Sequence, residues 1–248
     1  DGIRILQFQY PAVPVIYGLV PTYFLGVFLA YRKLIREGFR ADIIHAHVFT
    51  ALFTARMLGA LYHIPVVATE HYSIFHRSSI RWLYKWQARC AYRKIPYILP
   101  VSRALWNAMQ SIGIQGSYEI VPNTVDLDLF HPPDKADAQR GKKRILMVAI
   151  LTPIKGIPYL LEAVQKLKEH RDDFILDVGG DGEMRAEYES LTRSLRLSGD
   201  VIFHGLITKR TVAEMMRAAD FFALSSLWEN MPCVLIEAMA TGLPIVAT

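Results

Sequence analysis

Cysteine is scarce in this chain: Cys90 and Cys233 are the only two among 248 residues, and they lie far apart. Two isolated cysteines supply neither a disulfide framework nor a zinc site, and they suggest a reducing compartment. Long runs of like charge and low-complexity segments are also lacking, so nothing in the composition indicates disorder. The sequence is therefore expected to fold into ordered globular structure.

The sequence also lacks an uninterrupted apolar run of the length that a membrane span needs. Its most apolar stretch, Ala12–Ala30, is broken by Pro14 and Pro21, and we interpret it as a loop that leads into a core helix. The chain opens at Asp1, directly before a strand-like run. We therefore expect the native N-terminus to be missing, and the lack of a signal peptide carries no weight.

Hydrophobic residues make up 52% of the chain, which allows a sizeable core in one large or two modest domains. The chain has 28 Lys and Arg and 23 Asp and Glu, which gives a formal net charge of +5. An excess of basic residues favours anionic partners, but composition alone does not distinguish nucleotides, acidic lipids and nucleic acid.

Short β-branched runs alternate with longer segments of helical periodicity, for example Thr50–Tyr62 and Ile80–Arg93, which predicts parallel sheets covered on both faces. The segment His131–Lys143, rich in proline and charge, breaks this rhythm. We predict two doubly wound α/β domains, residues 1–130 and 144–248, joined by a linker at 131–143, with ligands at the carboxyl ends of the strands. The predicted strands are Ile3–Phe8, Asp42–Ala46, Pro65–Thr69, Tyr97–Val101, Glu119–Val121, Arg144–Ile150, Phe174–Val178, Val201–Phe203, Phe221–Leu224 and Ile245–Ala247.

The segment Ser225–Thr248 (SSLWENMPCVLIEAMATGLPIVAT) is the most informative. A strand that ends near Leu224 leads through a loop into a helix, with Pro232 predicted at its first position and Gly242 at its end. The first N–H groups of a helix have no partner inside it and suit a diphosphate. Here they would belong to Cys233, Val234 and Leu235.

Two carboxylates, Glu229 and Glu237, bracket that helix start with seven residues between them. A carboxylate repels a phosphate, so each needs a hydroxyl donor, and sugar hydroxyls on either side of a diphosphate meet that need. The alternative is a helix-capping acid together with a solvated helix acid.

Two further features follow strands of the same α/β unit. A glycine-rich turn, Gly179–Glu183 (GGDGE), lets a ligand approach the backbone, although any α/β unit can have one. Lys155, in the loop Leu151–Gly156, would offset diphosphate charge, although a lone lysine is usually just exposed. Together with the helix start they supply a dipole, a cation and hydroxyl acceptors.

The string ENMPCVLIEAMATGLPIVAT resembles the E-x7-E segment of the family-4 retaining glycosyltransferases. GGDGE, Lys155-Gly156, His204-Gly205 and Pro122–Asp126 (PNTVD) stand in the expected order, and the resemblance runs from about Asp42 to the end. It implies the GT-B fold, in which two Rossmann-like domains face each other across a cleft. Both domains would be incomplete at the ends of this chain.

The resemblance implies a hexosyltransferase that retains anomeric configuration and needs no metal or cofactor. The C-terminal domain would hold a UDP- or GDP-sugar, and the N-terminal domain a glycan or lipid-linked acceptor. His71, Lys155 and Glu229 would be catalytic, with Lys155 on the diphosphate and Glu237 on the ribose. The donor-binding residues would be Lys155, Gly180, Gly182, Gly205, Glu229, Asn230, Met231, Pro232, Cys233, Val234, Leu235 and Glu237. His71 has the alternative of a capping or core histidine.

Two short patterns imitate metal ligands. His45 and His47 alternate on a predicted strand, and Asp126 and Asp128 form a D-x-D pattern. Neither pair has a nearby third ligand at metal spacing, and the resemblance points to metal-independent transfer. We predict no metal site.

The chain departs from the family in one loop and at both ends. Members commonly carry an arginine five residues before the lysine of that loop, where this chain has Ile150. Phosphate neutralisation would then rest on Lys155 and backbone dipoles. Neither the family's opening strand and glycine turn nor its closing helices are present. We interpret the chain as an internal fragment, poorly active alone.

A basic stripe on the predicted helix Ile80–Arg93 could rest on an anionic membrane surface. The alternative is a solvated basic face over a tryptophan-containing edge of the core. The stripe consists of Arg81, Lys85, Arg89 and Arg93, beside Trp82 and Trp86.

Three functions stay open. The first is a cytoplasmic glycosyltransferase, peripheral at the inner membrane face if its acceptor is lipid-linked. The second is a nucleotide-binding or scaffold protein that keeps the fold without turnover. The third is a nucleotide-sugar epimerase relative. Nucleic acid is not expected as a partner of any of them.

Overall fold

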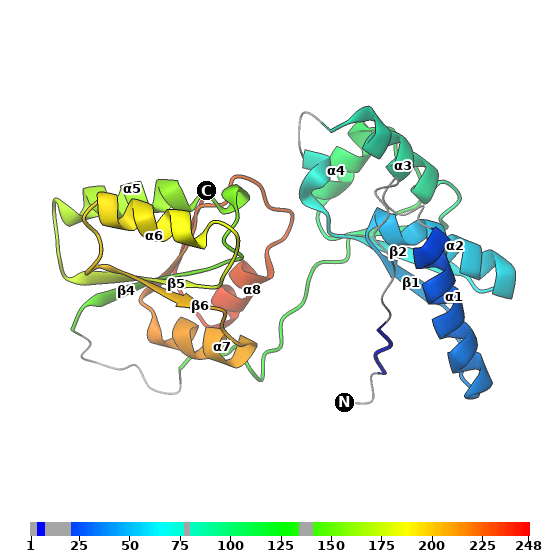
Figure 1. The fold of residues 1–248 in the computed structure, drawn as a ribbon, viewed down its shortest axis with the longest axis horizontal. Helices are drawn as coiled ribbons and strands as arrows, with labels where there is room; N and C mark the ends of the chain where they lie inside the picture. The colour runs from blue at the N-terminus through cyan, green and yellow to red at the C-terminus, as the bar shows by residue number, and fades with distance from the viewer. Residues whose placement is uncertain (1–3, 8–20, 77–79, 134–140) are drawn as a thin grey trace. The chain divides into compact units, whose positions relative to one another are not determined.

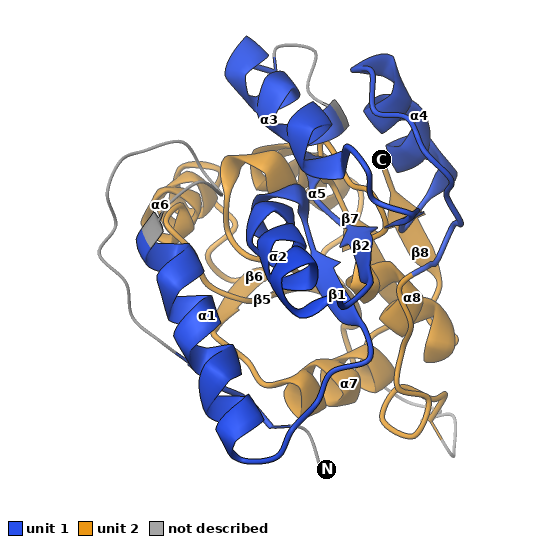
Figure 2. Ribbon diagram, turned by 90° about the vertical axis from the view of Figure 1, so that its right-hand side faces the viewer, with its two compact units in different colours: residues 1–122 blue, residues 123–248 orange. Residues whose placement is uncertain are grey.

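The computed structural model describes residues 4–7, 21–76, 80–133 and 141–248, in two compact units that are considered separately (Figures 1 and 2). Unit 1 is residues 1–122 and unit 2 is residues 123–248. The sequence assigned residues 123–130 to the first domain, but the structure places them in unit 2, where Phe130 is fully buried in the core. The predicted linker 131–143 accordingly belongs to unit 2, and its residues 134–140 lie outside the described part.

Unit 1 contains a parallel three-stranded sheet in the order β1–β2–β3. Helix α2 packs against β1 and β2, and α1 and α3 both pack against α2. The strands are Ile44–His47 (β1), Val66–Glu70 (β2) and Tyr97–Pro100 (β3), and the helices are Pro21–Arg36 (α1), Phe49–Tyr62 (α2), Trp82–Tyr92 (α3) and Arg103–Ser111 (α4), with a 3-10 turn at Ser73–His76 (η1).

Two predicted strands of unit 1 are not strands in the part of the chain that the structure describes. Of Ile3–Phe8, only residues 4–7 are described, and they form no regular structure. Glu119–Val121 does run along β3, since Glu119 N–H donates to Ile98 O and Val121 N–H to Pro100 O, both at 3.1 Å. Only one isolated β-bridge with β3 forms here, between Tyr118, just before the segment, and Ile98, which is too little for a strand. The segment is therefore a loop that follows the edge of the sheet.

Unit 2 contains a parallel five-stranded sheet in the order β6–β5–β4–β7–β8. Helices α5 and α6 cover one face and α7 and α8 the other, each over its own buried apolar cluster (Figure 1). The strands are Lys143–Val148 (β4), Phe174–Gly179 (β5), Val201–Gly205 (β6), Phe221–Leu224 (β7) and Ile245–Ala247 (β8), and the helices are Ile157–Lys168 (α5), Arg185–Ser194 (α6), Lys209–Ala218 (α7) and Cys233–Ala240 (α8), with a 3-10 turn at Pro153–Lys155 (η2).

The strand order of unit 2 fixes where a ligand fits. The chain passes from β4 outward to β5 and β6, then returns to the other side of β4 for β7 and β8. The loops after β4 and β7 therefore leave the sheet toward opposite faces. They flank the topological switch point, which is where open α/β sheets bind ligands. The doubly wound architecture predicted from the alternation is confirmed in this unit.

Helix α8 begins one residue later than predicted. Pro232 is the residue before the helix, with extended backbone angles, so the first helical position is Cys233. At the other end Gly242 has a φ of 69°. Its N–H donates to Met239 O and Leu243 N–H donates to Ala238 O, both at 3.0 Å, the bond pattern of a Schellman cap. Termination at Gly242 is confirmed.

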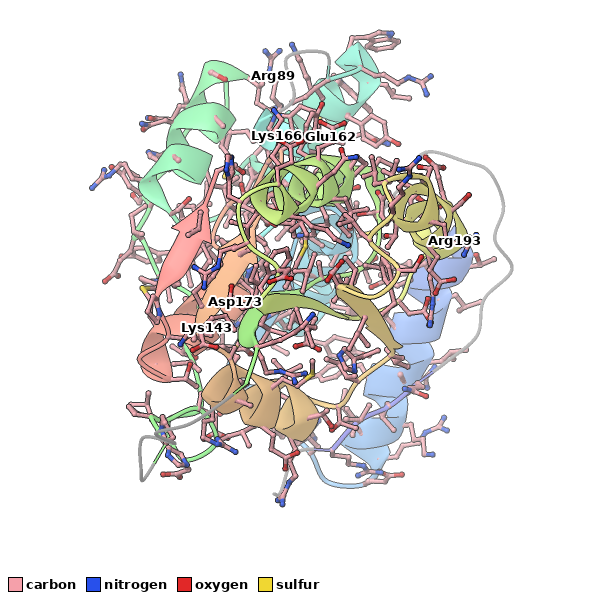
Figure 3. The ribbon with its side chains drawn as sticks, turned by 90° about the vertical axis from the view of Figure 1, so that its left-hand side faces the viewer. Arg89, Lys143, Glu162, Lys166, Asp173 and Arg193 are labelled. Carbon is pink, nitrogen blue, oxygen red and sulfur yellow. The ribbon has the colours of Figure 1, made fainter. Side chains whose placement is uncertain are left out.

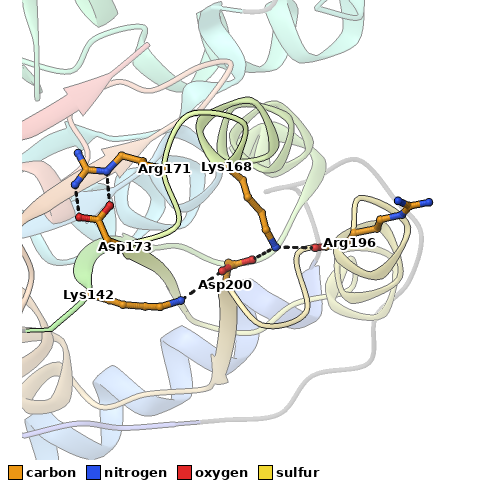
Figure 4. A network of polar contacts seen from close by, with 6 residues as sticks. All are labelled: Lys142, Lys168, Arg171, Asp173, Arg196 and Asp200. Carbon is orange, nitrogen blue, oxygen red and sulfur yellow. Dashed lines mark hydrogen bonds and ion pairs between the residues drawn. The ribbon is translucent and has the colours of Figure 1, made fainter.

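The opposite, amino edge of the same sheet carries a network of paired charges (Figure 4). Asp200, just before β6, is 5% exposed and pairs with Lys168 at 2.5 Å and Lys142 at 3.7 Å. Arg171 and Asp173 form a two-bond pair just before β5. These ion pairs join the amino ends of the strands and leave the carboxyl edge as the candidate site.

None of the helices in the described ranges combines the length and the apolar character that crossing a bilayer requires.

Candidate active site

The carboxyl edge of the unit 2 sheet brings together two of the predicted site residues. Lys155, in the turn after β4, places its ammonium 2.5 Å from Oε1 of Glu229, in the loop after β7. Their side chains are 22% and 24% exposed. The pair spans the switch point. The two opposite charges neutralise each other, and both side chains remain partly exposed to solvent. An incoming anion can therefore compete with Glu229 for the ammonium.

The two loops that carry this pair are fastened backbone to backbone. Leu227 N–H donates to Ile154 O at 2.8 Å, and the Ser225 hydroxyl donates to Lys155 O at 2.9 Å. Gly156 lies so close that a Cβ there would come within 2.0 Å of Ser225 O. Its φ of 59° independently favours glycine. A side chain at Gly156 would push apart the loops that pair Lys155 with Glu229.

The glycines of the GGDGE turn have the same structural task. A Cβ on Gly180 would meet Ala149 O at 2.0 Å, and one on Gly182 would meet Leu151 O at 2.5 Å. Their N–H groups are already used, since Gly180 donates to Gly205 O and Gly182 donates to Asp181 Oδ1. These glycines therefore shape the edge by letting protein backbones touch, and their two N–H groups have protein acceptors.

Ile150 lies in the loop after β4, because this strand ends at Val148, two residues earlier than the sequence predicted. Its side chain is 69% exposed, whereas the next residue, Leu151, is fully buried in the core. An exposed isoleucine contributes no charge, so Lys155 is the cation that this loop offers.

The sequence patterns gave no sign of one contact that supports the candidate site. Asn123, in the PNTVD motif, donates its side-chain amide to Met231 O at 2.7 Å. Its N–H also approaches the sulfur of Met231 at 3.4 Å. The motif thus fixes the loop between Glu229 and α8 from a segment 108 residues earlier in the chain. The predicted sites Asn230–Cys233 are held in place by this anchor.

Glu237 projects from α8, one turn after the helix start, and is half-buried. Burial raises the pKa of Glu237 above its usual value, and the ammonium of Lys209 offsets part of that shift. A half-buried carboxylate gains from a hydroxyl donor that replaces lost water, which fits the predicted contact with a diol.

The carboxyl edge of the unit 1 sheet gathers three histidines, two from β1 and one, His71, that directly follows β2. Nδ1 of His47 and Nε2 of His71 lie 3.0 Å apart, and Nε2 of His45 lies 2.6 Å from the hydroxyl of Thr69. The His45 and His47 rings are 4.4 Å apart between centroids. Burial lowers the pKa of His45, and the neighbouring His47 lowers it further. In the described residues, no three His, Cys, Asp or Glu side chains are arranged to hold a metal ion.

Glu70 holds this edge together from beneath. It is fully buried, and Oε1 accepts the N–H groups of His71 at 2.9 Å and Tyr72 at 2.7 Å. Oε2 accepts the N–H of Phe49 at 3.0 Å and the hydroxyl of Tyr92 at 2.7 Å. Burial raises the pKa of Glu70 despite these four donors, and it also raises that of Tyr92. His71 is therefore positioned by its backbone as well as by its ring contact.

The residue between β1 and α2 adds local strain. Val48 has a φ of 63°, a region that β-branched residues rarely occupy. Its N–H donates to Thr69 O, and the next N–H, of Phe49, donates to Glu70. Strained backbone persists where the surroundings over-determine it, and such positions cluster at functional sites.

An open hollow of ≈ 490 Å³ lies at the other, amino edge of this sheet. It is lined by Ile64, Val66 and Pro96, near the starts of β2 and β3, together with Arg56 and Lys94. Because it lies at the far ends of the strands from His71, it does not belong to the histidine edge.

Both halves of the chain match known families. Residues 4–129 match the family described as Glycosyltransferase Family 4, and residues 133–248 match the one described as Glycosyl transferases group 1. The putative glycosyltransferase EpsF of Bacillus subtilis (strain 168) is 32% identical over 237 residues, covering 87% of this chain and 59% of that protein. The UDP-Gal:alpha-D-GlcNAc-diphosphoundecaprenol alpha-1,3-galactosyltransferase of Escherichia coli is 30% identical over 243 residues, covering 88% and 60%. The chain thus spans about three fifths of these relatives.

Solved structures show the same fold. Sucrose-phosphate synthase from Thermosynechococcus elongatus superposes with a TM-score of 0.77 at 21% identity, covering 96% of this chain and 64% of that one. Anabaena Alr3699/HepE, in complex with UDP and glucose, gives a TM-score of 0.75 at 20% identity, covering 90% and 64%.

Proposed function

The chain belongs to the family-4, group 1 glycosyltransferases that its two halves match, and we propose that it transfers a hexose from a UDP- or GDP-sugar to a glycan or lipid-linked acceptor, with retention of configuration. The GT-B fold predicted from the sequence is confirmed by its structural relatives. Unit 2 is the donor-binding part of this proposal and unit 1 the acceptor-binding part.

The Lys155–Glu229 pair is the observation that carries the proposal. A diphosphate brings more negative charge than one carboxylate, so it competes well for a lysine that is only partly buried. When the ammonium turns to the diphosphate, the carboxylate of Glu229 becomes free to accept a hydroxyl of the sugar. Lys155 then stabilises the charge that grows on the leaving diphosphate in the transition state.

The remaining donor contacts follow from the same edge. Glu237 accepts the ribose hydroxyls, and the N–H groups of Cys233 and Val234, at the start of α8, face the diphosphate. The N–H of Leu235, which the sequence also assigned to the diphosphate, already donates to Pro232 O at 3.1 Å. No divalent metal is needed, since the lysine and the helix start supply the positive potential. In unit 1, His71 is the proposed catalytic residue on the acceptor side, and Glu70 holds its backbone N–H in place.

A lipid-linked acceptor and an anionic membrane surface at its cytoplasmic side are part of the proposal. They are supported by the name of the E. coli relative, which specifies a diphosphoundecaprenol acceptor. The net positive charge of the chain agrees with such a surface.

A second candidate function is donor binding without turnover. Exposed Ile150 favours it, because the loop then neutralises a diphosphate with one cation where two would hold the leaving group better.

Saturation-transfer NMR with UDP-, GDP- and ADP-sugars tests the proposal, first in EDTA and then with magnesium. We expect one nucleotide sugar to bind equally in both. Lys155→Met should weaken it roughly tenfold or more, whereas Lys166→Met, on the exposed face of α5, should not. Binding that is lost in EDTA, or equal losses in both variants, would contradict the site. Binding without product on any acceptor would select the second candidate.

A further inference from the structure

The two units carry formal charges of opposite sign. Unit 1 has 13 Lys and Arg against 5 Asp and Glu, which is +8, whereas unit 2 has 15 against 18, which is −3. Within unit 1 the segment from His71 to Tyr118 has seven Lys and Arg and no Asp or Glu at all. This segment contains α3 and α4. The positive charge of the protein is therefore concentrated, and it attracts an anionic partner to one part of unit 1.

Helix α3 presents two large aromatic side chains within this segment. Trp82 is 76% exposed and Trp86, one turn later, is 47% exposed. The inner face of the helix buries Ala88, Ala91 and Tyr92 against the unit. An exposed tryptophan leaves a large apolar surface in water, so two on one face mark a surface that has a partner.

Cations share that outward face with the tryptophans. Lys85 lies between them in sequence, and Arg89 follows it four residues later in the last turn of the helix. Arg93, four residues further on, is the residue that follows the helix, and both arginines are exposed. Arg89 also donates to Ile112 O at the end of α4, which ties α3 to its neighbour as a rigid element. Tryptophan with lysine and arginine is the combination found where a helix rests in the head-group region of a bilayer.

We propose that the outward face of α3 docks unit 1 on an anionic lipid surface. Trp82 and Trp86 insert at the head-group level, and Lys85, Arg89 and Arg93 pair with lipid phosphates. The alternative is a basic stripe that is simply solvated. Two exposed tryptophans beside the cations favour a lipid surface instead, because a solvated stripe needs no apolar side chains.

The position of α3 explains what this docking does. The helix follows η1 and the carboxyl end of β2, then runs back along the sheet, so Trp82 is at the end nearest in sequence to His71. A lipid-linked acceptor held in the surface would present its head group on the side of the histidine edge. This step rests on the proposed function, whereas the docking itself is independent of any donor.

Vesicle co-sedimentation tests the docking on the whole chain without nucleotide. We expect binding to vesicles of phosphatidylglycerol and phosphatidylcholine, weaker binding at high salt, and little binding to phosphatidylcholine alone. The double variant Lys85→Glu with Arg93→Glu should lower the partition coefficient at least tenfold, at about fivefold for each charge lost.

A matched control removes the same charge from unit 2. Lys166 on α5 and Arg193 on α6 are exposed (Figure 3), and Lys166→Glu with Arg193→Glu should leave the partition coefficient nearly unchanged. Equal losses in the two double variants would show that only net charge matters and would overturn the proposal. So would stronger binding to RNA than to the anionic vesicles.

Tryptophan fluorescence locates the face directly. Brominated lipids should quench the emission of the original protein and of Trp228→Ser, but not that of Trp82→Ser with Trp86→Ser. Quenching that survives in the double variant would place the contact elsewhere and refute the assignment to α3. Donor binding by NMR is read separately, so failure of this docking leaves the proposed transfer intact, and the reverse also holds.

Discussion

Glu229 in unit 2 and Glu70 in unit 1 are both carboxylates at the carboxyl edge of a parallel sheet, but their surroundings differ. Glu229 is paired with one lysine, and both side chains are about a quarter exposed. Glu70 is fully buried and accepts four hydrogen bonds from neutral donors. The first arrangement can exchange its partner for a ligand at little cost. The second cannot, since removing any donor leaves a buried charge less satisfied.

The contrast separates the two tasks that an acid performs at such an edge. A partly exposed ion pair is worth little to stability, so it is suited to ligand exchange. A buried carboxylate with saturated acceptors is costly to disturb, so it is suited to holding neighbours in place. We therefore expect substitutions of Glu229 to affect turnover, and substitutions of Glu70 to affect folding first.

The largest effect is expected for Glu229→Ala. Its carboxylate lies beside the reacting sugar in the proposed complex, so kcat should fall by roughly two to three orders of magnitude. Donor affinity should change little, because Lys155 is released for the diphosphate. Steady-state kinetics and calorimetry measure the two quantities. Glu162→Ala, on the exposed face of α5, is the control. A loss confined to affinity would show that Glu229 is not beside the sugar.

Glu70→Gln should destabilise the protein by about 2–3 kcal/mol. The amide NH2 of glutamine would replace one carboxylate oxygen and would face two hydrogen-bond donors in a buried site. Urea unfolding followed by circular dichroism gives the free energy. Glu119→Gln, an exposed acid of the same unit, should stay within about 0.5 kcal/mol of the original. Equal stabilities of the two variants would mean that the four-donor arrangement does not hold the edge.

Ile150→Arg should strengthen UDP or GDP binding by roughly tenfold, since a guanidinium can pair with two phosphate oxygens. The 69% exposure of Ile150 makes strain in the core a minor cost. Ile202→Arg, at an exposed position of β6, adds the same charge as a control. Unchanged nucleotide affinity with an unaltered thermal midpoint would show that residue 150 does not face the phosphates.

The smallest effect is expected for Glu237→Gln. A carboxyl whose pKa is raised on folding stabilises the protein most below its unfolded value, and that contribution is lost as pH rises through the folded value. The amide removes the loss, so the variant should be more stable at pH 7.5, by less than about 1 kcal/mol. Near pH 4 the gain should vanish. Thermal midpoints at both pH values test this, and equal gains at both would contradict a raised pKa. Nucleotide affinity should fall in parallel.

The sequence predicted the elements of unit 2 well, because each strand there contains a run of at least three consecutive apolar residues. Phe221–Leu224 and Ile245–Ala247 were placed to the residue. Glu119–Val121 was predicted as a strand because its pattern is that of one, but only its tertiary setting reveals that it pairs too briefly.

Within the candidate sites, contacts between residues far apart in the chain could not be predicted from the sequence. His47 meets His71 only because β1 and β2 pair in a register that aligns His47 with Thr69, and a slip of one residue would turn the side chain to the other face. Glu70 was overlooked because a single acid at the end of an apolar strand gives no sign of Tyr92 as its partner. The hydrogen bond between Asn123 and Met231 likewise could not be predicted, because the two residues are far apart in the sequence.

The bonds of Glu70 also have a consequence for the order in which the protein forms. All four of its donors lie between Phe49 and Tyr92. The bonds from Phe49 N–H and the Tyr92 hydroxyl join residues 21 and 22 positions apart, whereas those from His71 and Tyr72 are local. Loops of that length close at modest entropic cost, and domains near the N-terminus fold first during synthesis. The histidine edge can therefore be completed on the ribosome once Tyr92 has emerged, before any strand of unit 2 has been made.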